Sequence, residues 1–227
     1  MTTTQTSTAQ AVQVAPDLDK LADSFVQAFP RLDVDDQRLA IKLYQLLAKG
    51  KPVSRERLAQ ALGKSTDAIN QTLSQWPAVF YDESGHVVGF MGLNIKETRH
   101  RLQVNGITVY TWCAWDTLFI PQLLNATANV TSTCAATGEE IRLTVSPSRI
   151  EAADPHDIVV SFLTPDENEL RENTITSFCH FVYFFRSRKD GDAWVAEHDG
   201  TFLLSLDDAF MVGKKKNATR FKDVLER

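Results

Sequence analysis

The chain has 227 residues, of which 43% are hydrophobic and 23% charged, as is usual for soluble proteins with a buried core. Its formal net charge of −5 argues against a protein whose main task is to bind phosphates or anionic lipids. No run of apolar residues approaches the roughly 20 needed to cross a bilayer, so we expect no membrane partner.

The first 16 residues contain neither lysine nor arginine. A secretory signal begins with basic residues before an apolar run, and a mitochondrial transit peptide carries arginines. We therefore expect residues 1–17 to form a flexible polar tail and the protein to be cytoplasmic.

The next part of the chain is dominated by helical patterns. Apolar residues recur at helical spacing, and serines are placed as N-caps. The predicted elements are helices over 18–29, 33–49, 54–62 and 65–76, then a hairpin over 78–91. Helices followed by a hairpin form the winged-helix pattern, which we predict for residues 33–95 within an N-terminal domain of residues 18–95.

A winged helix raises the question of DNA binding. The helix that would read DNA, residues 65–76, has no lysine or arginine and carries Asp67 near its start. Winged-helix proteins contact phosphates through basic side chains. We therefore predict no nucleic-acid partner and interpret the domain as a structural cover for the rest of the chain.

From about residue 96 the pattern changes to strands with intervening helices. Strands are predicted over 98–104, 107–111, 128–133, 141–145 and 158–163, and helices over 113–124, 192–198 and 205–214. The aromatic run over 177–185 fits either a strand or a buried helix. The predicted fold class is α+β, with the N-terminal helical domain followed by a mixed, mainly antiparallel sheet domain with helices over residues 96–227.

The cysteines are the main candidates for chemistry. Cys113, Cys134 and Cys179 are isolated in the sequence, with no CxxC pair or zinc-finger spacing. Free cysteines are often simply buried, so each alone is weak evidence for function. The sequence also lacks a phosphate loop and the GxGxxG, HExxH and GxSxG motifs.

One short segment, YTWCAWD at residues 110–116, combines a thiol with a carboxylate. Cys113 and Asp116 are three residues apart and would share a face if this segment begins a helix. Burial among aromatic side chains would raise the pKa of Asp116 and make it a suitable acid near neutral pH. An aspartate at a helix start is, however, more often a cap or a first-turn charge.

The segments YTWCAWDTLFIP, TSTCAATGEEIRLTVSPSRI and TSFCHFVYFF resemble the bacterial organomercurial (alkylmercury) lyases in content, order and spacing. The resemblance covers roughly residues 35–210 and includes LLAKGKPVSRERLAQALG in the helical region. It implies that Cys113 and Cys179 are catalytic cysteines, Asp116 is the catalytic aspartate and Cys134 is a buried structural cysteine. Some relatives carry a second cysteine where this chain has His180.

The implied reaction fits these residue types. Mercury is a soft metal, and thiolate is the soft ligand that proteins offer. Thiolates from Cys113 and Cys179 would bind the mercury of R–Hg⁺, and Asp116 would pass a proton to the carbon, giving R–H and Hg²⁺. The resemblance implies no required cofactor, release of Hg²⁺ to an exogenous thiol, and a mercuric reductase as a candidate recipient. Residues 96–227 would be the catalytic domain.

Two residues beside the cysteines, Trp112 and Phe178, are candidates to line the substrate pocket, although both also fit as ordinary core aromatics. Two other functions stay open. The thiols would also suit a mercury sensor or trafficking protein that does not cleave its ligand. A cysteine hydrolase with Cys179 as nucleophile would need a histidine base, and the adjacent His180 would usually point elsewhere.

Overall fold

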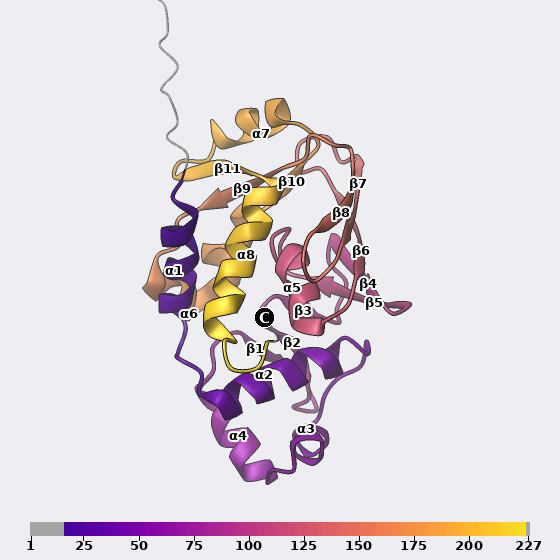
Figure 1. The fold of residues 1–227 in the computed structure, drawn as a ribbon, viewed down its shortest axis with the longest axis vertical. Coiled ribbons are helices and arrows are strands. Elements are labelled where there is room, and N and C mark those ends of the chain that lie inside the picture. Colours follow the sequence, from indigo (N-terminus) through magenta and orange to yellow (C-terminus); the bar gives the residue numbers. More distant parts are fainter. Residues whose placement is uncertain (1–15, 226–227) are drawn as a thin grey trace, which may run out of the picture.

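The computed structural model describes residues 16–225 (Figure 1). The tail predicted for residues 1–17 therefore lies almost entirely outside the described residues. The helices are α1 (Leu18–Ala28), α2 (Val34–Leu47), α3 (Arg55–Leu62), α4 (Thr66–Gln75), α5 (Asp116–Leu124), α6 (Glu167–Ser177), α7 (Arg188–Val195) and α8 (Leu206–Arg220), with a 3₁₀ turn at Cys179–Phe181. Over the described range, no helix has both the length and the apolar character needed to span a membrane.

The first four helices begin where the sequence provides capping side chains. The side chains of Asp17, Asp33, Ser54 and Ser65 each accept a hydrogen bond from a backbone N–H in the first turn of α1, α2, α3 and α4. Gly63 ends α3 with a left-handed backbone conformation at φ 64°. The predicted run of four N-terminal helices is confirmed.

Two antiparallel sheets follow. The strands are β1 (Val79–Tyr81), β2 (Val87–Phe90), β3 (Leu93–Asn94), β4 (His100–Val104), β5 (Ile107–Thr111), β6 (Ala128–Thr133), β7 (Glu140–Val145), β8 (Ile150–Asp154), β9 (Val159–Leu163), β10 (Phe184–Phe185) and β11 (Thr201–Ser205). The larger sheet has the order β1-β2-β3-β5-β4-β6-β7-β8, and the smaller one has β10-β9-β11. The predicted α+β class, with helices first and a mainly antiparallel sheet after them, is confirmed.

The larger sheet is continuous between the two predicted domains. β3 pairs with β2 on one side, where Phe90 faces Leu93, and with β5 on the other, where Leu93 faces Thr111. The predicted division at residue 95 therefore falls inside one hydrogen-bonded sheet. The hairpin β1–β2 of the winged-helix region forms one end of that sheet.

Several elements differ from the sequence prediction. The segment 177–185 is neither one strand nor one helix, because it contains the end of α6, the 3₁₀ turn and β10. The helix predicted over 113–124 is α5, which begins only at Asp116. Cys113 therefore lies before this helix. Helix α8 extends to Arg220, beyond the predicted end at residue 214. Strands β3, β8 and β11 and helix α6 were not predicted.

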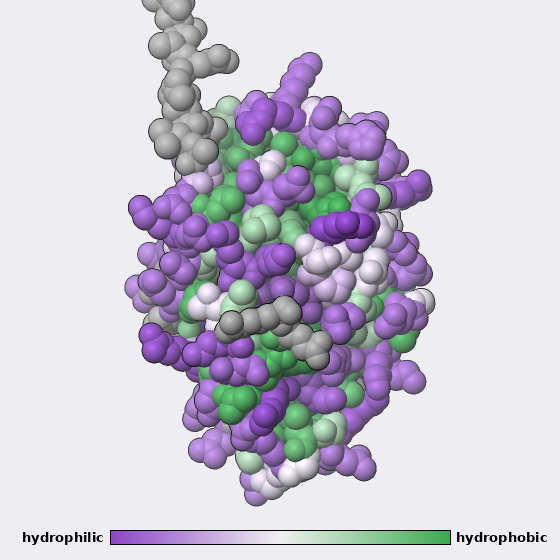
Figure 2. Space-filling view, viewed as in Figure 1, coloured by the Kyte–Doolittle hydropathy of each residue, from purple (hydrophilic) through white to green (hydrophobic). Residues whose placement is uncertain are grey.

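Helices from both halves of the chain surround the region where the candidate residues lie. Helices α1 and α8 pack side by side, and α5 lies between α8 and the larger sheet (Figure 1). The indole N–H of Trp115 donates to the carbonyl of Ala209 at 2.9 Å and fixes α5 to α8. Hydrophilic side chains cover most of the face seen in Figure 2, with hydrophobic patches between them.

Candidate active site

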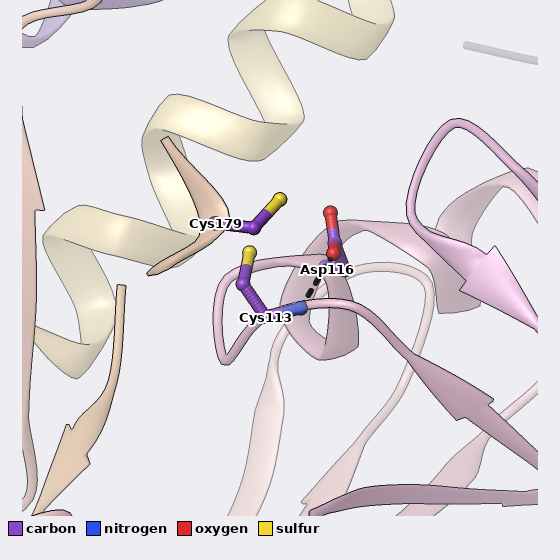
Figure 3. A group of neighbouring side chains, drawn as sticks. All are labelled: Cys113, Asp116 and Cys179. Atoms are coloured by element: carbon purple, nitrogen blue, oxygen red, sulfur yellow. Dashed lines mark hydrogen bonds between the residues drawn. The ribbon is translucent and has the colours of Figure 1, made fainter. Parts of the chain in front are cut away.

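A tight turn before α5 brings Cys113 and Asp116 together. The backbone N–H of Cys113 donates to Oδ2 of Asp116 at 2.9 Å, so the carboxylate reaches back across the turn (Figure 3). This resembles a capping box, in which an acidic side chain in the first turn accepts from a backbone N–H that precedes it. Cys113 and Asp116 were expected to share a helix face, but they meet across the turn that precedes α5.

The third residue arrives from a distant part of the chain. Cys179 begins the 3₁₀ turn that follows α6. The backbone N–H of Ala114 donates to the carbonyl of Val182 at 3.2 Å, which joins this turn to the segment after Cys113. The two sulfurs and a carboxylate oxygen of Asp116 all lie within 4.8 Å of one another (Figure 3). The structure thus brings together the three residues that the sequence singled out.

Burial controls the protonation of the three groups. It raises the pKa of the Cys113 thiol well above its ordinary value, and the neighbouring Cys179 and Asp116 add to that effect. At Cys179, a hydrogen bond from Cys113 favours the thiolate, but burial and the charge of Asp116 outweigh it and raise the pKa. Burial also raises the pKa of Asp116 to about 6, although the Cys113 N–H partly opposes this. With no metal ion bound, both thiols therefore hold their protons near neutral pH.

The raised pKa of Asp116 predicts a pH-dependent stability. The folded protein holds this proton more tightly than the unfolded chain, whose carboxyl has an ordinary pKa of 3.8. The stability from this group is therefore greatest below pH 4 and falls as pH rises through about 6, by roughly 1–3 kcal/mol in total. Urea unfolding at pH 4, 5.5 and 7 gives the free energy of unfolding of the wild type and of Asp116→Asn. As pH rises, the value for the variant should increase relative to that of the wild type. A difference in unfolding free energy that stays constant from pH 4 to pH 7 would contradict the burial of an ionisable carboxyl.

An apolar pocket opens beside these three residues. Asp116 and Cys179 line it, together with Trp112 and Phe178. Half of the remaining lining residues are aromatic: Phe25, Phe29, Tyr44, Trp76, Phe90, Trp115, Phe119 and Phe221. Several of these residues belong to the N-terminal helices and the hairpin, so the winged-helix region forms part of the wall. Such a pocket suits an apolar organic group and excludes water from the carboxyl.

Gly92 supports Asp116 from the β2–β3 turn. Its carbonyl accepts from the Trp112 N–H at 2.9 Å, and the preceding carbonyl, of Met91, accepts from the Tyr44 hydroxyl at 2.8 Å. A Cβ at position 92 would lie 2.6 Å from Cγ of Asp116, with Oδ1 closer still. Its φ of 99° also disfavours any residue with a side chain. Only glycine therefore leaves the carboxyl in place.

If Asp116 is the proton donor that the sequence resemblance implies, we expect Gly92→Ala to lower turnover by about 10²-fold, because a displacement near 1 Å of a reacting group has that order of effect. Gly138→Ala is the matched control, since Gly138 also has a positive φ of 72° but nothing lies within 4 Å of an added Cβ. Both variants should lose stability, and only Gly92→Ala should lose turnover per folded molecule. Equal turnover in the two would mean that Gly92 does not position Asp116.

The other sequence candidates lie outside this cluster. Cys134 is 1% exposed, and its backbone closes the β6–β7 turn through hydrogen bonds with Glu139 and Gly138. His180 is exposed and does not line the pocket. The sequence interpretation missed Gly92 and also two cations of α8, Lys216 and Arg220, which line the pocket wall.

The chain is similar to known proteins over most of its length. The family model described as alkylmercury lyase matches residues 93–216, and that described as the helix-turn-helix domain of alkylmercury lyase matches residues 18–91. The alkylmercury lyase of Pseudomonas putida is 43% identical over 176 residues, which are 77% of this chain and 81% of that protein. The enzyme of Streptomyces lividans is 41% identical over 172 residues, or 76% and 78% of the two chains.

A solved structure shares the fold. The crystal structure described as the mercury-bound form of MerB2 superposes with a TM-score of 0.71 at 23% identity, over 87% of this chain and 96% of that one. The sequence relatives, which are enzymes by name, carry the family assignment. From the matched segments and the identity over three quarters of its length, the chain belongs to the alkylmercury lyase family.

Proposed function

We propose that the chain cleaves the carbon–mercury bond of organomercurials by protonolysis, with Cys113, Asp116 and Cys179 as catalytic residues. The observation that carries the proposal is the buried group of two sulfurs and one carboxylate within 4.8 Å. Thiolates are the preferred ligands of a soft metal. Family membership supports mercury chemistry at this site.

The proposed steps balance without a redox reagent. The thiol of one cysteine loses its proton to Asp116 as its sulfur binds the mercury of R–Hg⁺, and the second thiol loses its proton to solvent as it binds. The two thiolates weaken the Hg–C bond, whose electron pair takes the proton held by Asp116. The sum is R–Hg⁺ plus two thiols giving R–H, one H⁺ and Hg²⁺ bound by two thiolates. Mercury keeps its oxidation state throughout.

The residues around the site fit this sequence of events. A carboxyl with a pKa of about 6 both accepts and donates a proton near neutral pH. Trp112 and Phe178 line the pocket and are proposed to contact the organic group. No resident cofactor enters the scheme, and an exogenous thiol removes Hg²⁺ by exchange. Transfer of Hg²⁺ to a mercuric reductase and a cytoplasmic location belong to the same proposal.

The proposal assigns no nucleic-acid partner to the helix-turn-helix region. Helix α4, the counterpart of a recognition helix, contains no lysine or arginine. The hairpin of this region is part of the larger sheet. Strand β2 is paired on both sides, and Phe90 lines the pocket.

The deciding experiment is headspace gas chromatography of methylmercury incubated with the purified protein and excess thiol. We expect methane in proportion to the Hg²⁺ formed, over many turnovers per protein molecule. Stoichiometric binding of methylmercury or Hg²⁺ without methane would instead support a trafficking protein and would contradict the lyase proposal.

A further inference from the structure

Two buried cations line the apolar pocket. Lys216 and Arg220 lie one turn apart on α8, each is only 8% exposed, and both belong to the pocket wall that includes Asp116. Buried lysine and arginine side chains are rare unless a partner compensates their charge. Their position in a mainly apolar pocket therefore requires an explanation.

No carboxylate among the described side chains forms an ion pair with either cation. Nζ of Lys216 lies 3.1 Å from the centre of the Phe119 ring and 4.9 Å from that of Trp115. The guanidinium of Arg220 lies 5.4 Å from the centre of the Phe29 ring, and it donates to the carbonyl of Pro30 at 3.4 Å. These contacts hold the cations in place but supply no negative charge.

The pocket therefore holds more basic than acidic side chains. Its ionisable lining comprises two cations against the carboxyl of Asp116, besides the Tyr44 hydroxyl and the Cys179 thiol. Burial lowers the pKa of Lys216 well below its usual range, with Asp116 only partly opposing this, and lowers that of Arg220 to about 10. An anion entering the pocket would favour the charged form of Lys216 and offset the cost of burying both cations.

The proposed reaction indicates which part of the substrate meets these cations. Mercury lies between the sulfurs, and its carbon must face Asp116 to receive the proton. The organic group therefore extends into the pocket whose lining includes Asp116, Lys216 and Arg220. An anion near the two cations is thus a substituent of the organic group.

We propose that this pocket selects organomercurials whose organic group carries an anionic substituent, of which a carboxylate is the simplest, and that Lys216 and Arg220 recognise it. This inference rests on the proposed lyase function. The aromatic walls hold the carbon skeleton, and the two cations distinguish a charged from a neutral organic group.

The test compares two substrates that differ in one group, 4-(hydroxymercuri)benzoate and phenylmercury, by chromatography of the benzoate and benzene formed. The quantity measured is the ratio of the two kcat/KM values, so a general loss of activity cancels. Lys216→Met keeps the length of the side chain and removes its charge. We expect it to lower the ratio about ten- to hundredfold, the usual effect of losing a hydrogen bond to a charged group.

Two further variants complete the test. Lys214→Met removes the same charge from the same helix at a position outside the pocket, and its ratio should stay within about twofold of wild type. Arg220→Met provides a second charge removal in the pocket and should also lower the ratio. An unchanged ratio in both pocket variants would overturn the inference while leaving the lyase function intact, whereas a wild type that cleaves neither substrate would overturn the proposed function itself.

Discussion

Asp116→Asn should retain mercury and lose most carbon–mercury cleavage. The amide keeps the shape of the side chain, and its oxygen can still accept from the Cys113 N–H, so the turn before α5 should survive. The amide cannot carry the proton, and delivery of a proton by a positioned acid is typically worth about 10²–10⁴-fold. We expect a loss of this order in kcat, measured by gas chromatography of the hydrocarbon.

Two measurements separate the chemical step from binding and folding. Mercury retained after desalting should be close to wild type in Asp116→Asn. Asp67→Asn, which makes the same replacement in the first turn of α4 at an exposed position, should leave turnover unchanged. Near-normal cleavage by Asp116→Asn would mean that water or a thiol supplies the proton. The role of Asp116 would then be limited to stabilising the turn before α5.

Cys179→Ser should lose both tight mercury binding and turnover. A hydroxyl is a hard and weakly acidic ligand for a soft metal, so only the Cys113 sulfur would remain at the site. We expect cleavage to fall to the background rate and mercury to be lost during desalting in the presence of a competing monothiol. Mercury content by atomic spectroscopy and hydrocarbon release on the same samples provide the measurement.

Cys134→Ala is the matched control for that experiment. Cys134 is as buried as the other two cysteines but stands outside the cluster of possible metal ligands found in the described residues. Its replacement should cost some stability and leave turnover and mercury retention intact. Loss of turnover in a folded Cys134→Ala variant would show that the wrong cysteines have been assigned.

The sequence predicted the features that depend on neighbours in the chain. Capping residues such as Ser54 and Ser65, followed by apolar residues at helical spacing, mark the N-terminal helices because both signals are local. Helix α6 escaped prediction because its sequence, ENELRENTITS, is polar and its backbone is non-helical at Asn173. Strand β8 is largely exposed and lacks a continuous apolar face.

The candidate site shows the same division. Cys113, Asp116 and Cys179 were found through motifs that resemble a known family. Lys216 was not, because a run of three lysines at residues 214–216 usually indicates a solvated surface, and the predicted helix ended at residue 214. Lys216 lies in the pocket because α8 extends to Arg220 and packs against α5. Neither feature can be read from the sequence around the three lysines. The contact of Gly92 with Asp116 is likewise tertiary and leaves no local signal.

The shared sheet has a consequence for how such a protein can evolve. In a free-standing DNA-binding module the hairpin projects as a finger, and the module can be joined to unrelated partners. Here β2 and β3 are interior strands, and removing the segment before Leu93 would take β2 away from β3 and Trp76 and Phe90 away from the pocket. Neither half can be exchanged alone without exposing a sheet edge and opening the pocket to water. The two halves are therefore expected to be inherited together, as one gene segment.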